Sequence, residues 1–288
     1  MNQNDVFGNG DSSFEEGVAP NPVQDALSHR TKFLPWHKPR KQWIRKMQWA
    51  DSIALLVDTL KLKDLHEPLR YLSLPGPDLL DIRSIQPICV DRQIELQFIG
   101  LNAGVDDSDS ALSLALLSQV RALPYIHKAS EVVTDKFEHL AQQKSIAYAK
   151  IITLQRSFDV VNIDLCGSFA ENLSGATEPN IPTAIFSLLK HQLQHRAKDW
   201  LFFITTRSDR SAVNSKTMES FVKWLNEQIA NNLALKDTII EKKLLSADEF
   251  DDNLIAIERL SPQSHSNVLS MGLGHWILDA LIKTAPAW

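Results

Sequence analysis

The sequence predicts an α/β fold with a doubly wound, mostly parallel sheet. Apolar runs typical of buried strands alternate with segments of helical periodicity, which indicates parallel βαβ units. Several of these runs end in polar residues, as in FDVVNIDLCGSF at 158–169 and ELQFIGLNAG at 95–104. Because ligands bind beyond the carboxyl ends of the strands in open α/β sheets, the polar ends predict a site along that edge.

The strands are expected where short apolar runs are rich in β-branched and aromatic residues. Val160, Val161 and Ile163 are typical of a strand that is buried on both faces. The expected strands are residues 79–82, 94–101, 131–134, 158–165 and 200–206, with a weaker sixth strand at 254–260.

The helices are expected where apolar residues recur at helical spacing. The first expected helix, at 39–62, begins within the basic segment and is followed by the Pro-Gly-Pro turn cluster at 73–78. Asp107, Ser108 and Asp109 suit the amino end of the second. The expected helices are residues 39–62, 107–123, 136–154, 181–197, 215–232 and 271–283.

Composition is that of an ordinary soluble globular protein, with 44% hydrophobic and 23% charged residues in a chain of 288. No run approaches the roughly 20 apolar residues that span a bilayer, and no signal peptide is evident, so no membrane association is expected. Cys89 and Cys166 lie far apart, and the nine histidines form no metal-binding motif. These features predict no metal and a reducing, cytoplasmic location.

Charge divides the chain into three expected parts. Residues 1–28 contain five acids and no Lys or Arg, and we expect a disordered acidic leader. Residues 29–72 are expected to be a basic helical extension, because 29–49 contain seven Lys or Arg and no acid. Residues 73–288 are expected to form the sheet domain, of Rossmann-like type.

The basic segment at 29–49 interleaves cations with tryptophans, a pattern that suits a nucleic-acid backbone and stacked bases. An acidic protein surface, including the chain's own leader, is an alternative partner. A solvated basic face whose tryptophans pack into the core is a third reading. The candidate nucleic-acid-binding residues are Lys38, Arg40, Lys41, Trp43, Arg45 and Lys46.

Four strand ends, LLDIRS, FIGLNAG, VVTDKF and NIDLCG, follow one another in an order that resembles class I S-adenosylmethionine-dependent methyltransferases. The resemblance covers roughly residues 73–235. It implies S-adenosylmethionine as cofactor, with Asp81 at the end of the first strand, Asn102 at the ribose and Asp135 near adenine. It also places Asp164, Cys166 and Gly167 at the edge where the chemistry occurs, with Asp164 and Cys166 as the candidate catalytic residues and Gly167 beside the cofactor.

The sequence departs from that family's pattern in two places. The expected cofactor turn at 81–87 contains no glycine, and Asn102 replaces the usual acid. Asp164 could assist proton transfer or cap the next helix. Cys166 could be a nucleophile or a buried structural thiol.

Two functions of different classes therefore remain open. The first is a divergent S-adenosylmethionine-dependent methyltransferase-like protein that acts on or near nucleic acid. The second is a non-catalytic Rossmann-like interaction subunit of a bacterial nucleic-acid-maintenance or defence assembly. The two readings share a fold and differ in whether the cofactor binds.

Overall fold

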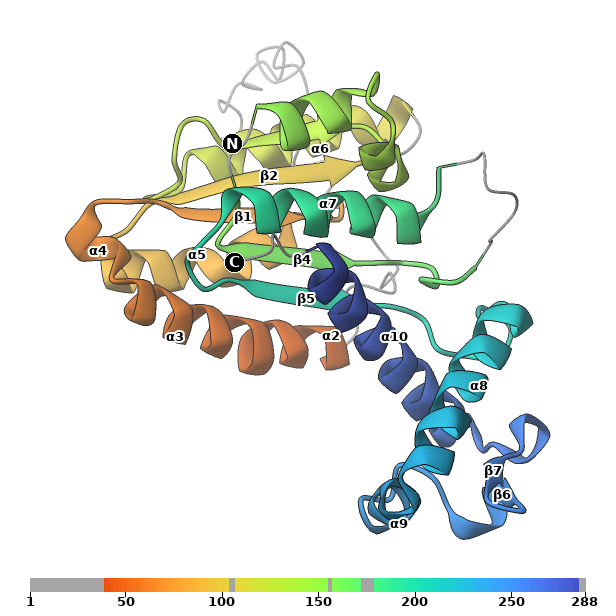
Figure 1. Cartoon of the computed structure of the whole chain (residues 1–288). Coiled ribbons are helices and arrows are strands. Elements are labelled where there is room, and N and C mark those ends of the chain that lie inside the picture. Colours follow the sequence, from red (N-terminus) through yellow and green to blue (C-terminus); the bar gives the residue numbers. More distant parts are fainter. Residues whose placement is uncertain (1–38, 104–106, 155–156, 172–178, 285–288) are drawn as a thin grey trace, which may run out of the picture.

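The structure is a computed structural model that describes residues 39–103, 107–154, 157–171 and 179–284. The acidic leader and Lys38 lie outside the described residues. A five-stranded parallel sheet forms the centre of the molecule, in the order β3-β2-β1-β4-β5, which confirms an α/β fold (Figure 1). The strands are β1 (Leu69–Ser73), β2 (Leu96–Asn102), β3 (Glu131–Thr134), β4 (Val160–Asp164) and β5 (Leu201–Thr205).

Side chains alternate between the two faces of the sheet, as the period of a strand requires. Tyr71 of β1 and Phe98 of β2 belong to one apolar cluster, whereas the neighbouring Leu72 and Ile99 belong to the other. Leu72 pairs with Ile99 on one side and with Val161 of β4 on the other, so β1 is a central strand. Burial on both faces explains why these strands are continuous apolar runs.

Helices cover both faces of the sheet (Figure 1). One face carries the amino-terminal helical segment together with α5 and α6, and the other carries α7 and α10. Trp49 of the amino-terminal segment stacks on Phe203 of β5, with ring centroids 6.1 Å apart. The helices here are α2 (Pro39–Ile44), η3 (Arg45–Trp49), α3 (Ala50–Leu60), α4 (Leu62–Leu65), α5 (Leu80–Arg92), α6 (Asp107–Arg121), α7 (Ile181–His195) and α10 (Pro262–Thr284).

The first strand is not where the sequence analysis placed it. Residues 80–82 begin helix α5, with Leu79 as its N-cap, and the central strand is Leu69–Ser73. Leu79 adopts the left-handed conformation with φ 51°, which turns the chain from the loop into the helix. The expected boundary between 72 and 73 consequently falls inside β1, and the basic helical segment packs on the sheet as an integral part of the same domain.

The expected single long helix at 136–154 is also wrong, because the structure has two short helical turns there in place of one helix. The segment contains a 3-10 turn, η4 (Phe137–Ala141), and a π-helical turn, η5 (Tyr148–Thr153). Asp135 holds both pieces, because its carboxylate accepts hydrogen bonds from the backbone N–H of Lys136 and of Ala147. These bonds tie both pieces to Asp135, at the end of β3.

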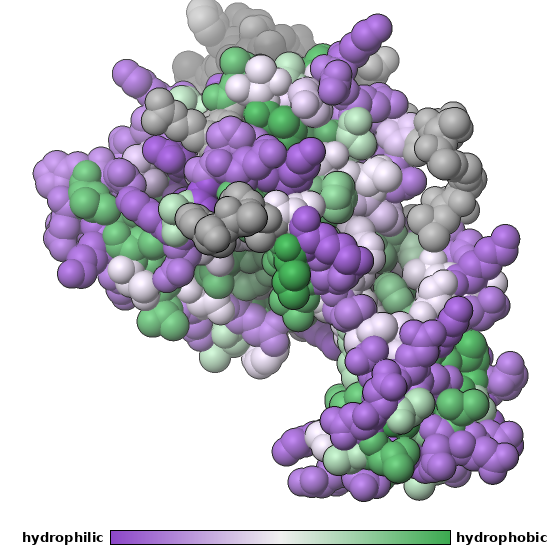
Figure 2. All heavy atoms as spheres, in the orientation of Figure 1, coloured by the Kyte–Doolittle hydropathy of each residue, from purple (hydrophilic) through white to green (hydrophobic). Residues whose placement is uncertain are grey.

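A lobe projects beyond the sheet and is joined to it by α8 and α10 (Figures 1 and 2). The expected strand at 254–260 is only a two-residue strand here, which pairs antiparallel with its neighbour and lies outside the main sheet. The expected final helix at 271–283 is confirmed and begins earlier, at Pro262. The lobe contains α8 (Ser215–Asn231), α9 (Leu233–Glu241), η6 (Ala247–Glu249), β6 (Phe250–Asp251), β7 (Leu254–Ile255) and η7 (Ile257–Arg259).

Candidate functional site

A pocket of about 420 Å³ lies at the carboxyl ends of the strands. The loops that follow β1, β2, β3 and β4 all contribute to it, so it occupies the edge where ligands bind in open parallel sheets. Its volume falls in the range of small-molecule sites. The polar and charged residues that line it are Arg45, Asp78, Asp81, Asn102, Asp135, Glu138, Asp164, Cys166 and Glu171.

All six residues that the sequence analysis assigned to a cofactor or to chemistry line this one pocket. They come from four separate stretches of the chain and meet because parallel strands bring their ends together. Asp81 is present for a different reason than expected, since it lies in the first turn of α5 and not at a strand end. The six are Asp81, Asn102, Asp135, Asp164, Cys166 and Gly167.

The loop after β1 does contain a glycine, contrary to the expected glycine-free turn. The chain runs from Ser73 through Leu74, Pro75, Gly76 and Pro77 into α5, and the carbonyl of Gly76 accepts a hydrogen bond from Leu79 N–H at 3.0 Å. Gly76 lines the pocket. The loop was not recognised as the one after the first strand, because that strand was expected at 79–82. The turn cluster at 73–78 is the sequence feature that marks the loop.

Gly100 of β2 fixes the position of the same loop. A Cβ at Gly100 would lie 2.6 Å from Pro75 Cγ and 3.2 Å from Val132 Cγ2. The absence of a side chain therefore lets the β1–α5 loop lie directly against β2. This close approach defines one wall of the pocket.

Asp81 is the buried end of a polar network beneath the pocket. Tyr71 donates its hydroxyl proton to Asp81 Oδ2 at 3.1 Å, and Asn162 Nδ2 donates to Tyr71 Oη at 2.7 Å. Burial raises the pKa of Asp81, against the opposing effects of Ser73, the Ile82 backbone, Tyr71 and the positive charge of Arg45. Burial likewise raises the pKa of Tyr71, which keeps its hydroxyl protonated and able to donate.

Asp164 at the end of β4 is engaged by two cations of the amino-terminal helical segment. Lys41 forms an ion pair with Asp164 Oδ1, and Arg45 Nη2 lies 3.8 Å from Asp164 Oδ2. The Arg45 side chain is only 4% exposed and the Asp164 side chain 14% exposed. The structure thus places the basic segment directly on the candidate catalytic edge, a contact that sequence spacing did not reveal.

Asp135 follows β3 and is held by three donors. His139 Nδ1 lies 2.6 Å from its Oδ1, and the N–H groups of Lys136 and Ala147 each donate at 2.8 Å. Burial alone would raise the pKa of Asp135, but these hydrogen bonds outweigh it and hold the pKa below its usual range. Asp135 is therefore a fixed, ionised acceptor at neutral pH.

Cys166 and Gly167 form the start of the loop after β4. Cys166 is an exposed residue, but partial desolvation of its thiol and the charge of Asp164 raise the pKa of the thiol, against the opposing charge of Lys41. A thiol that stays protonated at neutral pH is poorly suited to nucleophilic attack. A Cβ at Gly167 would lie 2.4 Å from Glu171 Oε2, so Glu171 lies directly over this glycine.

The basic helical segment presents a different set of residues to solvent than the sequence suggested. Arg40, Lys46 and Trp43 are exposed, Trp43 to 56%. Lys41 is partly buried and Arg45 is buried, because both point to Asp164. The predicted role of Arg45 in nucleic-acid binding does not fit this burial, and Lys38 lies outside the described residues.

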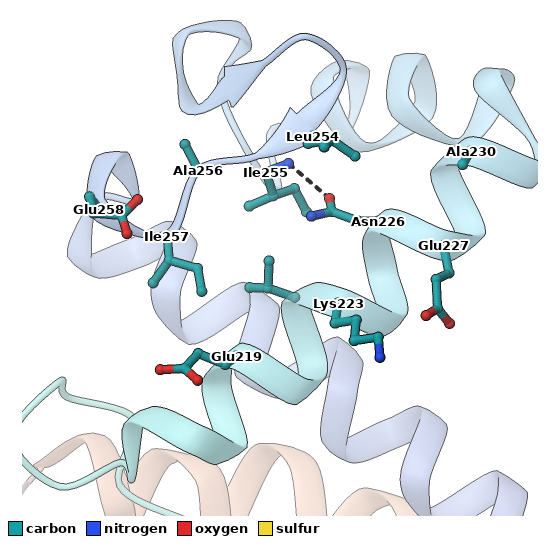
Figure 3. Close-up of a pocket in the computed structure, with 11 residues that line it drawn as sticks. Glu219, Lys223, Asn226, Glu227, Ala230, Leu254, Ile255, Ala256, Ile257 and Glu258 are labelled. Atoms are coloured by element: carbon teal, nitrogen blue, oxygen red, sulfur yellow. Dashed lines mark hydrogen bonds between the residues drawn. The ribbon is translucent and has the colours of Figure 1, made fainter.

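A second cavity, of about 520 Å³, lies in the lobe between α8 and β7 (Figure 3). Ile255 N–H donates to Asn226 Oδ1 at 2.8 Å across its end, and Glu219, Lys223 and Glu227 project from α8 along it. It is a shallow groove away from the strand ends of the main sheet, and the titratable side chains that line it are exposed. The strand-end pocket is therefore the better candidate site.

Within residues 39–103, 107–154, 157–171 and 179–284, no cluster of three or more His, Cys, Asp or Glu is arranged to hold a metal ion. None of the helices in that part of the chain is long and apolar enough to cross a membrane.

Fold and pocket together define an α/β protein with a small-molecule-sized site at the carboxyl edge of a parallel sheet. The chain belongs to the PP_RS20740-like family, whose model matches residues 30–288. No curated protein and no solved structure matches it. The family's name states no activity.

Proposed function

We propose that the protein is a divergent S-adenosylmethionine-dependent methyltransferase-like protein that binds its cofactor in the strand-end pocket. The observation that carries the proposal is the convergence of four strand-end loops on one pocket, with Gly76 in the first loop and Asn102 and Asp135 in the next two. The order β3-β2-β1-β4-β5 supports a Rossmann-like sheet, in which β1 and β4 flank the switch point.

The charge of the pocket favours a cationic ligand over a phosphate-bearing one. Six carboxylate side chains line it, and Arg45 is the one Lys or Arg among the lining residues that the structure describes. Such a surface repels phosphates and attracts a sulfonium or an ammonium group. S-adenosylmethionine carries both cations and supplies a methyl group from its sulfonium when bound.

The residues of the pocket fit the parts of that cofactor. Gly76 has no side chain to obstruct a ligand that approaches the first loop, and the Asn102 amide offers both a donor and an acceptor to ribose hydroxyls. Asp135 is a fixed acceptor beyond β3, in the position where an adenine amine would be read. Asp164, at the end of β4, would accept a proton from the group that receives the methyl.

Nucleic acid is the proposed acceptor or neighbouring partner. Arg40, Trp43 and Lys46 are exposed on the helical segment whose Lys41 and Arg45 reach the pocket. Two cations and an exposed indole suit a phosphate backbone and a stacked base. A nucleic acid on this face would therefore lie beside the pocket.

One observation favours the second candidate function, a non-catalytic interaction subunit. Both Lys41 and Arg45 already engage Asp164, the residue expected to handle a proton. A carboxylate held in this way can serve to fix the amino-terminal segment on the sheet. In that case the pocket binds no cofactor, and the exposed basic face of the helical segment binds the partner.

Isothermal titration calorimetry with S-adenosylmethionine and S-adenosylhomocysteine separates the two. The methyltransferase-like reading expects micromolar binding of at least one of them to the full chain. Asn102→Ala should then weaken binding by about 10-fold, the value of one or two hydrogen bonds. Asn226→Ala, which makes the same change in the lobe cavity, should leave binding unaltered. Absence of heat at millimolar ligand would contradict the proposal and leave the interaction subunit.

A further inference from the structure

The amino-terminal helical segment at 39–60, formed by α2, η3 and α3, buries only one of its sides. Its inward residues recur every four positions, and Trp49 among them stacks on Phe203 of the sheet. In Figure 1 the segment runs along the margin of the molecule, so its other side faces away from the sheet. The inward residues are Arg45, Trp49, Ile53 and Val57.

The outward side of the segment carries large apolar side chains. Trp43 is 56% exposed, Met47 48% and Leu55 69%. Each lies two residues before an inward residue, which is roughly half a helical turn and therefore the opposite side. Together with the exposed Asp51 they form one row, which we call the outer stripe. Exposed apolar groups that gather in one row mark an interaction surface, whereas scattered ones do not.

The π-helical turn η3 keeps the outer stripe on one side of the segment. In an α-helix of about 3.6 residues per turn, side chains four residues apart drift steadily around the axis. A π turn takes more residues per turn, because its hydrogen bonds run from residue i to i+5. η3 lies between Trp43 and Leu55 and offsets part of this drift. The two large side chains therefore share one surface.

Charge is divided between the two halves of the segment. Residues 39–50 contain four Lys or Arg and no acid, whereas residues 51–60 contain two Asp and no Lys or Arg. A helix with this distribution complements a second copy of itself when the two run antiparallel, because each basic half then meets an acidic half. The exposed charged residues are Arg40, Lys46, Asp51 and Asp58.

We propose that the outer stripe is the interface of a homodimer, in which two copies of the segment pack antiparallel about a two-fold axis. With the axis near the middle of the segment, Trp43 of one copy packs on Leu55 of the other. In the same register Arg40 lies opposite Asp58, and each contact occurs twice. Arg92 already holds the Asp58 carboxylate at 2.8 Å, and the remaining lone pairs can accept the second guanidinium.

A nucleic acid is the competing occupant of the amino-terminal end of the stripe. Along the whole stripe the charges favour a second copy, because phosphates would be repelled by Asp51 and Asp58. Trp43 cannot stack on a base while it is buried between two copies, so the two complexes exclude each other at this residue. The inference goes beyond the proposed function, since no residue of the outer stripe lines the strand-end pocket.

Analytical ultracentrifugation of the full chain at about 5 to 100 µM measures the association. The wild type should approach the mass of a dimer over this range. Leu55→Lys should weaken the dimer by at least about 30-fold, because it removes an apolar contact and brings a cation against the basic half of the other copy. Leu114→Lys in α6 is the matched control, since Leu114 is 66% exposed and lies outside the stripe, and it should associate like the wild type.

Disulfide formation tests the antiparallel register. Cys89 is buried and Cys166 is exposed, so the experiment uses chains that carry Cys166→Ser. A mixture of Trp43→Cys chains and Leu55→Cys chains should form a linked dimer on mild oxidation. Neither variant alone should do so, because in this register each position and its own copy lie about 18 Å apart along the helix axis.

A wild-type chain that stays monomeric up to about 100 µM would overturn the proposal. Equal association of Leu55→Lys and wild type would do the same, as would Leu55→Cys chains that link to themselves as readily as to Trp43→Cys chains. Dimerisation that occurs only after addition of duplex DNA would assign the stripe to nucleic acid instead. No S-adenosylmethionine is present in these measurements, so their outcome is independent of the calorimetry.

Discussion

Arg196 Nη2 lies 2.8 Å from Asp159 Oδ1, and the two side chains are only 5% and 6% exposed. Asp159 precedes β4, and Arg196 follows α7, so the pair joins the entry of one central strand to the end of the helix that covers it. Asp159 Oδ2 also accepts the backbone N–H of Arg70 in β1 at 2.6 Å. One carboxylate therefore fixes three elements at the amino edge of the sheet, opposite the pocket.

Arg196→Met should cost about 3–5 kcal/mol in the free energy of unfolding, because it leaves the Asp159 carboxylate buried without its cation. Urea unfolding of the full chain measures this loss. The exposed pair Lys198–Glu67, 3.2 Å apart, is the control, and Lys198→Met should cost less than about 1 kcal/mol. Equal costs for the two variants would show that burial of the first pair does not matter.

Two glycines of α10 should respond in opposite directions to the same substitution. A Cβ at Gly272 would lie 2.2 Å from Phe221 Cγ of α8, whereas a Cβ at Gly274 meets nothing within 4 Å. Gly272→Ala should destabilise the protein by about 1–3 kcal/mol through overpacking of the two helices. Gly274→Ala should stabilise it by about 0.5–1 kcal/mol, because alanine favours the helix. Thermal unfolding of both variants checks the signs, and a shared sign would contradict the close approach of α8 and α10.

Glu249 should make the stability of the protein depend on pH in the acid range. Its carboxylate accepts the N–H groups of Ser246 at 2.8 Å and Ser261 at 2.7 Å. Burial acts to raise the pKa of Glu249, but these hydrogen bonds prevail and hold it below its usual range. Because the pKa is lower in the folded state, ionised Glu249 stabilises the fold at pH values above its unfolded pKa of about 4.3. This stabilisation is lost as the pH falls through the folded-state pKa.

Glu249→Gln should therefore be less stable than wild type at pH 7, by about 1.5–3 kcal/mol, and the difference should shrink toward pH 3. Denaturant unfolding at a series of pH values measures it. The exposed Glu258→Gln is the matched control and should differ little from wild type at any pH. A Glu249→Gln deficit that stays constant with pH would exclude ionisation as the cause.

The exposed cations of the helical segment should carry any nucleic-acid binding. Arg40→Glu with Lys46→Glu should reduce binding in a gel shift and lower the salt dependence of the affinity by about two phosphate contacts. Lys242→Glu with Lys243→Glu, the same charge change on the lobe, should leave binding unchanged. Equal loss in both double variants would indicate a response to net charge alone.

Much of the sheet could be predicted from the sequence, because β2 to β5 are apolar runs long enough to be recognised. The central strand could not, since Leu69–Ser73 is short and contains the charged Arg70. The run at 79–82 misled because a short apolar run fits a buried strand as well as the first turn of a helix, and α5 begins there. A strand therefore seemed to fit where the first turn of a helix lies.

Part of the pocket lining could be predicted from the order of the elements, but the contacts within the pocket could not. Strand ends in a parallel sheet must meet, so Asn102, Asp135 and Asp164 could be grouped from the order of elements alone. The pairing of Lys41 and Arg45 with Asp164 depends on how the amino-terminal helices dock on the sheet, which no local pattern specifies. Gly76 was missed because the strand before its loop was misplaced. Glu138 lies in η4, within a segment that was expected to be one long helix, and Glu171 was passed over in the loop after β4.

Helix α10, 23 residues and about 35 Å long, returns from the lobe to the face of the sheet that α7 covers. One continuous apolar cluster includes Leu72 and Val161 of the sheet together with Ile239 and Phe250 of the lobe. The lobe has no separate core with which to fold, so sheet and lobe should exchange their slowest amide hydrogens in a single concerted opening. A ligand held at the strand ends would then slow exchange in the distant lobe by the same factor.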